Sequence, residues 1–167
     1  MEIRRLTPHD ASDFRCLRLR ALKEHPQAFT SSWEEEREAQ VDAVRLRLAR
    51  DEVQFWGALE QAALCGMVGL QRETRAKNRH KGTVVAMYVA PEQAGHGMGR
   101  ALLDALIADA QRAGLELLVL TVTEGNSGAA KLYERCGFRS FGIEPRAIKV
   151  EGRAWAKNHM YLELQPS

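Results

Sequence analysis

Cysteine is scarce in this sequence and scattered along it. Cys16, Cys65 and Cys136 are the three cysteines among 167 residues, and no two of them form a CxxC pair. An odd number of widely separated cysteines argues against a disulfide framework and against a zinc site, so we expect no bound metal. This cysteine usage is typical of a reducing compartment, and we expect the protein in the cytoplasm.

The sequence also lacks an excess of one charge and any long apolar run. Its 24 basic and 22 acidic side chains leave a formal net charge of +2, which predicts neither a nucleic-acid nor a membrane partner. The longest apolar stretch, residues 62–70, is interrupted by glycines and too short to span a bilayer. No apolar stretch follows the N-terminal arginines, so a signal peptide is not expected. With 45% hydrophobic residues, the chain fits one compact domain over residues 1–167.

Hydrophobic periodicity and turn residues predict an α+β chain, a mixed α/β arrangement in three layers. Its strand-rich part comes first, and a single strand–helix–strand crossover lies in the middle, unlike a regularly alternating doubly wound sheet. Expected strands cover residues 2–6, 53–59, 64–71, 83–89 and 115–122, with a hairpin over 140–164 that turns at residues 151–152. Two helical regions are expected to start near the capping residues Thr7 and Ser32. Two further helices are expected over residues 100–113 and 127–135.

Glycines are concentrated where an expected strand passes into an expected helix. Residues 95–99 read Gly-His-Gly-Met-Gly and precede the helical pattern directly. Glycine allows a ligand to approach the backbone closely, and successive N–H groups at a helix N-terminus suit a phosphate or pyrophosphate. Alone, such a loop is equally compatible with a tight turn that opens a structural helix.

A Rossmann dinucleotide site fits this loop poorly. The spacing is GxGxG and not GxGxxG, and the loop comes after more than half of the chain. The next strand ends in Thr121, Val122 and Thr123 without a carboxylate at the position that would bind ribose, and Glu124 follows too late. A dinucleotide-dependent oxidoreductase is therefore the third-ranked hypothesis.

A second motif follows the next apolar strand. The pattern N-x-x-A-x-x-x-Y-x-x-x-G-F is met residue for residue from Asn126 to Phe138. Together with the glycine loop, it resembles the GNAT superfamily, the acetyl-CoA-dependent N-acetyltransferases. The resemblance implies the GNAT fold, with a central, mostly antiparallel sheet and one splayed parallel strand pair. One loop position departs from the family pattern, because Ala94 stands where Gln or Arg is usual. This affects one side-chain contact to phosphate and not the backbone cradle, which residues 95–99 would form.

The resemblance implies an acetyl-CoA site along both motifs. The pantetheine arm of the cofactor would add to the splayed strand by β-augmentation, and its pyrophosphate would lie on the amides of residues 95–100. The expected cofactor-binding residues are Met87, Tyr88, Val89, Gly95, His96, Gly97, Met98, Gly99, Arg100, Asn126, Ala129 and Tyr133.

Tyr133 is the expected general acid. A phenol with a pKa near 10 holds its proton at neutral pH and can donate it to the departing thiolate. Tyr133 lies two helical turns after Asn126, which keeps both on one helix face; the alternative is that it only packs in the core. The base that deprotonates the amine stays open, since the strand before the glycine loop has no acid. His80, Glu124 and a water chain are the candidates.

No motif identifies the acceptor. The acidic residues 34–36 would suit a cationic amine, although acids favour helix N-termini in any case, and Glu144 or Arg146 is expected on the acceptor side. The leading hypothesis is an N-acetyltransferase in which a primary amine attacks acetyl-CoA directly, with a homodimer suggested by the family. The alternative is a non-catalytic acyl-CoA-binding sensor or subunit.

Overall fold

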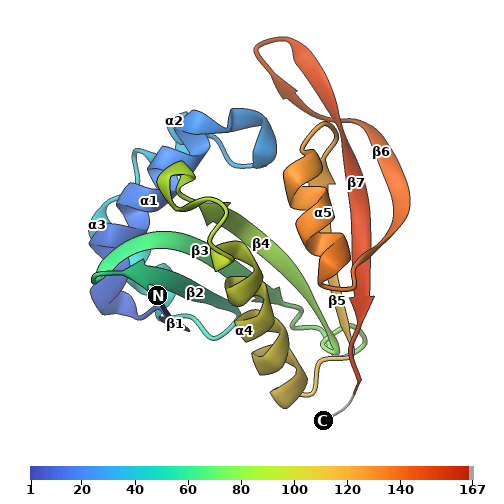
Figure 1. Cartoon of the computed structure of the whole chain (residues 1–167), viewed down its shortest axis with the longest axis horizontal. Helices are drawn as coiled ribbons and strands as arrows, with labels where there is room; N and C mark the ends of the chain where they lie inside the picture. Colours follow the sequence, from blue (N-terminus) through green and yellow to red (C-terminus); the bar gives the residue numbers. More distant parts are fainter. Residues whose placement is uncertain (166–167) are drawn as a thin grey trace.

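The computed structural model describes residues 1–165 and contains one seven-stranded sheet. The strand order is β1-β2-β3-β4-β5-β7-β6 (Figure 1). Neighbouring strands are antiparallel except β4 and β5, which run parallel. This confirms the expected α+β class with one parallel pair; residues 166 and 167 of the expected domain lie outside the described residues.

The element bounds agree closely with the expected ones. The strands are β1 (Glu2–Arg5), β2 (Val53–Glu60), β3 (Ala63–Arg72), β4 (Lys81–Val89), β5 (Leu117–Thr123), β6 (Arg139–Val150) and β7 (Arg153–Glu163). The helices are α1 (Ala11–Glu24), α2 (Trp33–Glu36), α3 (Val41–Leu48), α4 (Met98–Arg112) and α5 (Ser127–Arg135), with 3₁₀ turns η1 (Pro8–Asp10), η2 (Pro26–Ala28) and η3 (Pro91–Gln93). None of the helices within residues 1–165 is long and apolar enough to cross a membrane.

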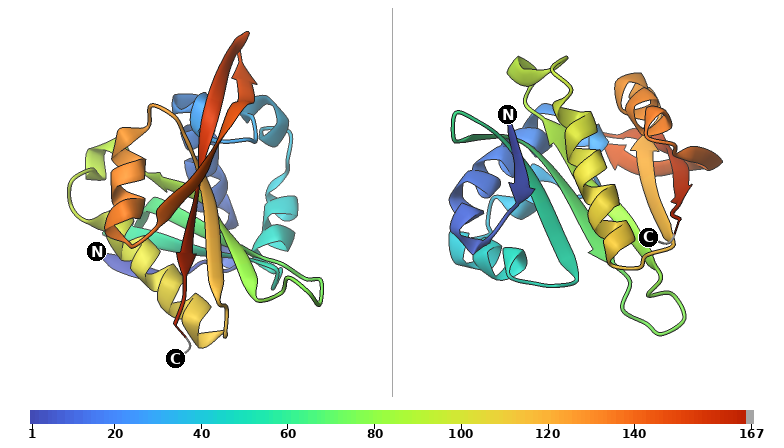
Figure 2. Two further views of the ribbon diagram at one scale, coloured as in Figure 1. Left: turned by 90° about the vertical axis from the view of Figure 1, so that its right-hand side faces the viewer. Right: turned by 60° about the horizontal axis from the view of Figure 1, so that its bottom comes forward.

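Alternate residues of the central strands face two separate apolar cores. Phe55 and Met67 pack in the core that includes α1 and α3, whereas Trp56 and Val68 pack in the core that includes α4 and α5. All four side chains are at most 2% exposed. Successive strand residues point to opposite faces, so the sheet is the middle one of three layers (Figure 2).

Helix α4 shows why this arrangement forms. Leu102, Leu103 and Leu106 recur on one helix face and are completely buried against the sheet. Burial of each leucine stabilises the fold by roughly 1.5–3 kcal/mol. At the far end of the helix, Trp56 Nε1 donates a hydrogen bond to Asp109 Oδ2 over 2.8 Å, which fixes α4 over β2.

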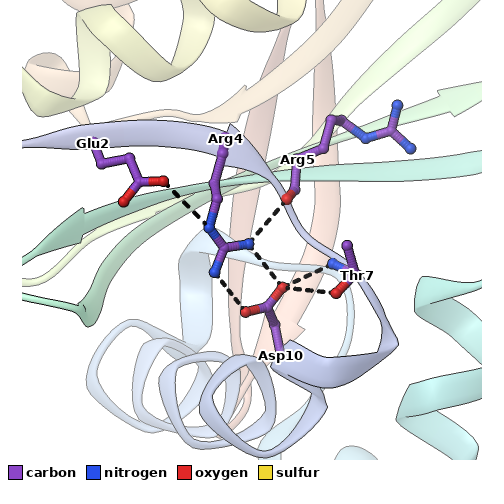
Figure 3. A network of polar contacts seen from close by, with 5 residues as sticks. All are labelled: Glu2, Arg4, Arg5, Thr7 and Asp10. Atoms are coloured by element: carbon purple, nitrogen blue, oxygen red, sulfur yellow. Dashed lines mark hydrogen bonds and ion pairs between the residues drawn. The ribbon is translucent and has the colours of Figure 1, made fainter.

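A polar network sets the entry into α1 (Figure 3). The Arg4 guanidinium donates two hydrogen bonds to the Asp10 carboxylate, at 2.8 and 2.9 Å, and the Thr7 backbone N–H donates a third at 2.8 Å. These contacts lower the pKa of Asp10 to about 2, and the hydrogen bonds from the Arg4 guanidinium have the largest effect. The network joins β1 to the start of α1 and so orients the helix that carries Arg18.

Strands β4 and β5 separate after a short paired stretch. They pair only from Lys81 to Thr83 on β4, although β4 continues to Val89 (Figure 1). On its other side β4 has a bulge against β3, where Ala86 has a φ of +56°. A bulge bends its strand. The expected splayed pair is therefore present, and its open end leaves backbone groups of β4 without a β5 partner.

Candidate active site

Two adjoining cavities occupy the open end of the splay. The inner cavity, of about 440 Å³, is lined by consecutive residues of both strands, 83–87 on β4 and 121–123 on β5. Because consecutive strand residues point to opposite faces, this cavity lies in the gap between the strands. The outer groove, of about 600 Å³, lies beside it over the residues 87–89 and 123–126. Residues common to both linings are Ala28, Phe29, Met87, Thr123, Asn126 and Ala129.

The predicted residues of β4 line the outer groove. Met87, Tyr88 and Val89 all contribute to it. Tyr88 is buried, and its hydroxyl donates a hydrogen bond to Glu24 Oε2 over 2.7 Å. Burial and this hydrogen bond raise the pKa of Tyr88 above its ordinary value. Its side chain is therefore bound to α1, and the backbone is what Tyr88 can offer a ligand.

The glycine loop leads directly into the N-terminus of α4. Gly97 is the N-cap with a φ of +75°, and a Cβ at this position would meet no atom within 4 Å. The first intrahelical hydrogen bond from this end is the one from Ala101 N to Gly97 O, so the amides of Met98, Gly99 and Arg100 precede it. These three N–H groups can bind an anion.

The side chains around this loop are mostly committed elsewhere. Met98 is 2% exposed in the core, and a Cβ at Gly99 would lie 3.0 Å from Leu132 Cδ2. Arg100 pairs with Asp104 and donates to the Arg135 carbonyl oxygen. His96 is exposed. The loop therefore presents mainly backbone to a ligand.

Helix α5 brings Asn126, Ala129 and Tyr133 to the cavities. Asn126 caps the helix, with its Oδ1 accepting a hydrogen bond from Ala129 N over 3.3 Å, and Asn126 and Ala129 line both cavities. Tyr133 lines the inner cavity and packs edge-to-face on Phe138. Burial raises the pKa of the Tyr133 phenol above its ordinary value, so this hydroxyl is protonated at neutral pH.

The two predicted base candidates lie in different places. Glu124 is exposed just beyond β5 and lines the outer groove. His80 precedes the other end of β4 and lines neither cavity. The six residue steps from Lys81 to Met87 correspond to about 20 Å of strand. The structure therefore brings Glu124, and not His80, to the site.

Sequence reasoning missed the cations of the inner cavity. Arg18 of α1, Arg47 of α3 and Lys157 of β7 all line it, and within the described chain no aspartate or glutamate does. Burial lowers the pKa of both Arg47 and Lys157. The three residues come from distant segments with no shared spacing, so no motif could have indicated them.

The acidic and tail residues proposed for the acceptor side lie outside the inner cavity. Glu36 accepts hydrogen bonds from Arg18 Nε and Nη2, each at 3.1 Å, so it neutralises a cation of the protein. Glu144 pairs with His159 over 2.8 Å on the outer hairpin. Neither Glu144 nor Arg146 lines either cavity. Glu144 and Arg146 differ from expectation because the β6–β7 hairpin that carries them projects past the splay (Figure 2).

The segment after α1 closes the inner cavity from one side. Thr123 Oγ1 donates a hydrogen bond to the Gln27 carbonyl oxygen over 2.7 Å, and Lys157 Nζ donates to Thr30 Oγ1 over 2.6 Å. Both contacts hold η2 and the residues after it against β5 and β7, and they place Phe29 at the junction of the two cavities.

Comparison with known families agrees with this geometry. The model of the acetyltransferase (GNAT) family matches residues 19–138. The chain belongs to this family. The match includes the glycine loop, both splayed strands and the α5 motif, so the GNAT resemblance of the two motifs is confirmed.

Curated relatives match parts of this GNAT chain. An L-methionine sulfoximine/L-methionine sulfone acetyltransferase of Pseudomonas paraeruginosa is 36% identical over 88 residues, which are 52% of this chain and 51% of that protein. A mycothiol acetyltransferase of Geodermatophilus obscurus is 40% identical over 63 residues, 38% of this chain and 20% of that protein. The chain thus spans about half of the first of these relatives and a fifth of the second.

Solved structures show the same fold over the whole length. The acetyltransferase of the GNAT family from Streptococcus pneumoniae superimposes with a TM-score of 0.87 at 24% identity and covers 98% of this chain and 99% of its own. The yncA protein of Salmonella typhimurium, solved with its cofactor acetyl-CoA, gives a TM-score of 0.86 at 23% identity over 100% of this chain and 95% of its own.

Proposed function

We propose that this protein transfers the acetyl group of acetyl-CoA to a primary amine that binds in the inner cavity. The observation that carries the proposal is the junction of the two cavities at Met87, Asn126 and Ala129, in the open end of the splay. A cofactor arm in the outer groove and an amine in the inner cavity would meet there. Family membership supports the acetyl-transfer chemistry.

The residues of the cofactor side fit acetyl-CoA. Beyond Thr83, β4 has no β5 partner, so its backbone can hydrogen-bond an extended arm as a neighbouring strand would. The amides of residues 98–100 at the N-terminus of α4 suit the pyrophosphate. When bound, acetyl-CoA supplies a thioester carbonyl that an amine can attack.

Tyr133 is the proposed general acid. Its hydroxyl stays protonated at neutral pH because burial raises its pKa, and a protonated phenol beside the junction can donate a proton to the thiolate that departs from the acetyl group. Phe138 packs against the ring edge-to-face with 5.9 Å between centroids, which fixes its orientation.

Deprotonation of the amine is helped by the charge of the inner cavity. Its lining contains Arg18, Arg47 and Lys157, and nearby positive charge lowers the pKa of an ammonium group. The acceptor amine therefore loses its proton more readily than in water. Glu124 on the outer groove, or a water chain past it, is the proposed route for this proton.

The first experiment is a thermal shift of the purified protein with acetyl-CoA and, in parallel, with NAD. Ligand at a hundred times its dissociation constant stabilises a fold by ~2.7 kcal/mol, which raises the melting temperature of a domain of this size by about 5–10 °C. We expect this shift with acetyl-CoA alone. A shift with NAD and none with acetyl-CoA would overturn the proposal.

The second experiment separates an enzyme from a binding module. Release of free CoA thiol is followed while amines of different classes are added to the protein with acetyl-CoA. Amine-dependent release supports the transferase, whereas tight cofactor binding without release for any amine would favour the non-catalytic sensor. The cytoplasmic location and the homodimer stay predictions of the sequence.

A further inference from the structure

We propose that the inner cavity selects acceptor amines that also carry a carboxylate, which Arg18, Arg47 and Lys157 bind. This inference rests on the proposed function and names the chemical class of its acceptor. The three cations come from three different elements and converge on a single cavity of about 440 Å³. A convergence of this kind is the local environment that a buried anion requires.

The charge balance of the cavity is positive. No aspartate or glutamate of the described chain lines it. Of the carboxylates beside its cations, Glu36 is paired with Arg18, and Glu144, which lies opposite Lys157 across β6 and β7, is hydrogen-bonded to His159. The remaining polar lining is neutral and consists of hydroxyl and amide side chains: Thr30, Ser31, Gln71, Thr83, Thr121, Thr123, Asn126 and Tyr133. A polyamine or another purely cationic acceptor would be repelled here, whereas a carboxylate would be attracted.

Arg18 has an N–H group that no protein group accepts. The residue is 6% exposed; Nε and Nη2 bind Glu36, while the buried Nη1 has no hydrogen-bond partner in the described structure. The guanidinium carbon lies 5.0 Å from the centroid of the Phe29 ring, which holds the group in place. Buried donors are nearly always satisfied, so an unsatisfied arginine nitrogen beside a cavity indicates a missing acceptor.

Arg47 supplies a second guanidinium, and unlike Arg18 it has no salt bridge within the described residues. It lies over the rings of Phe55 and Phe14, at 5.1 and 6.0 Å from their centroids, and its side chain has no hydrogen bond or ion pair within residues 1–165. Its burial disfavours the charged form and lowers its pKa. An arginine placed on aromatic rings at the wall of a cavity is preorganised for a carboxylate, which it can bind in a bidentate manner.

Lys157 lies nearer to the junction of the cavities. It pairs with Thr123 across β5 and β7, and Thr123 lines both cavities. Within the described residues its Nζ donates one hydrogen bond, to Thr30 Oγ1 at 2.6 Å, although an ammonium can donate three. A carboxylate close to the reacting amine can therefore bind Lys157, and a more distant one can bind the arginines.

Matched acceptor pairs test the charge preference directly. L-Methionine is compared with L-methioninamide and L-glutamate with L-glutamine, and spermidine serves as a polycation; CoA release gives kcat/KM for each. Methioninamide has the less basic amine, so a larger fraction of it is deprotonated at neutral pH. Chemical reactivity alone would therefore favour it over methionine. We expect the carboxylate to raise kcat/KM at least tenfold in one pair or both, and spermidine to be the poorest acceptor.

The outcomes separate this inference from the proposed function. Equal or better use of the amide in both pairs, or of spermidine, would contradict carboxylate selection and leave the acetyltransferase intact. If no probe is acetylated, the same compounds are tested for a melting-temperature shift of the CoA-loaded protein. A larger shift from the carboxylate of either pair than from its amide supports the inference, and the absence of such a difference contradicts it. Absence of an acetyl-CoA shift would instead contradict the proposed function itself.

Variants then identify the binding groups. Lys157→Gln removes one cation, and the double variant Arg18→Gln/Glu36→Gln removes the paired charges together so that Glu36 is not left unpaired. Arg139→Gln is the matched control, because Arg139 is an exposed cation on the same hairpin and lines neither cavity.

We expect both cavity variants to lower the carboxylate-to-amide ratio of kcat/KM about tenfold. The change should come from KM for the acceptor, and KM for acetyl-CoA should not change. An unchanged ratio in folded variants would overturn the assignment.

Discussion

The two sides of the splay are built by different means. The proposed cofactor side consists of the backbone of neighbouring segments, namely the unpaired end of β4, the N-terminus of α4 and the capped start of α5. The proposed acceptor side consists of charged side chains of α1, α3 and β7. A backbone site depends on a few residues at fixed spacing, whereas a side-chain site depends on where distant elements meet.

The two sides also differ in how they carry charge. The proposed cofactor side offers the partial positive charge of a helix N-terminus, and Arg100 in the first turn of that helix is bound to Asp104. The inner cavity offers full charges on Arg18, Arg47 and Lys157, with Glu36 neutralising one of them. The helix N-terminus suits a ligand that is always the same, whereas the charged side chains of the inner cavity can differ with the acceptor. The first two variants below test Tyr133 and the glycine loop, and the last two test the stability of segments that position the two sides.

The largest effect is expected for Tyr133→Phe. Loss of the proton donor should lower kcat by about 10²–10⁴-fold, while Phe keeps the packing on Phe138. Turnover and the acetyl-CoA thermal shift are measured together, and the shift should be unchanged. A variant with wild-type kcat would remove Tyr133 from the mechanism.

The second effect is on the backbone cradle. Gly97→Val should weaken acetyl-CoA binding at least tenfold, because a β-branched residue is strained at a φ of +75° and its side chain would enter the space before α4. Calorimetric titration gives the dissociation constant. Gly152→Val is the matched control, since Gly152 has a φ of +80° with equally open surroundings at the hairpin turn; it should lose stability and keep its affinity.

The third effect is on stability and on its dependence on pH. Asp10→Asn should lower the free energy of unfolding by about 1–2 kcal/mol at pH 7, because the carboxylate accepts charge-assisted hydrogen bonds. The pKa of Asp10 is about 2 in the folded state, below the ordinary value of about 3.9. Its contribution is therefore complete above pH ~4 and is lost as the pH falls toward 2.

Urea unfolding across this pH range checks the Asp10 prediction. Wild type and variant should converge in stability at the acid end, since a protonated Asp10 no longer accepts these charged contacts. A difference that stays constant from pH 7 to pH 2 would mean that the carboxylate charge is not what stabilises the entry into α1.

The smallest effect is expected at the β4 bulge. Ala86 has a φ of +56°, where glycine relieves strain of about 1 kcal/mol but gains about as much freedom in the unfolded chain. Ala86→Gly should therefore change the melting temperature little, and Ala86→Val should lower it. A large loss in the glycine variant would show that the Ala86 methyl group, and not the backbone, stabilises the bulge.

Most of the fold was predictable because its signals are local. The α5 helix begins and ends at the expected residues, and the terminal hairpin turns where Glu151 and Gly152 predicted. The start of α4 was placed two residues late, since its N-cap is the loop glycine Gly97 and not a polar side chain. The bulge at Ala86 had no local signal, because alanine rarely adopts a positive φ.

By itself, the sequence determined the succession of strands and helices around the glycine loop, the two motifs and the candidate acid Tyr133, because each is encoded by residues at fixed spacing within one segment. Only the tertiary structure decided that Glu124 reaches the site and His80 does not, since the two lie at opposite ends of the splayed strands. It also decided the positive inner cavity. Arg18, Arg47 and Lys157 are ordinary cations in the sequence, and they line one cavity because the packing of α1, α3 and β7 brings them together.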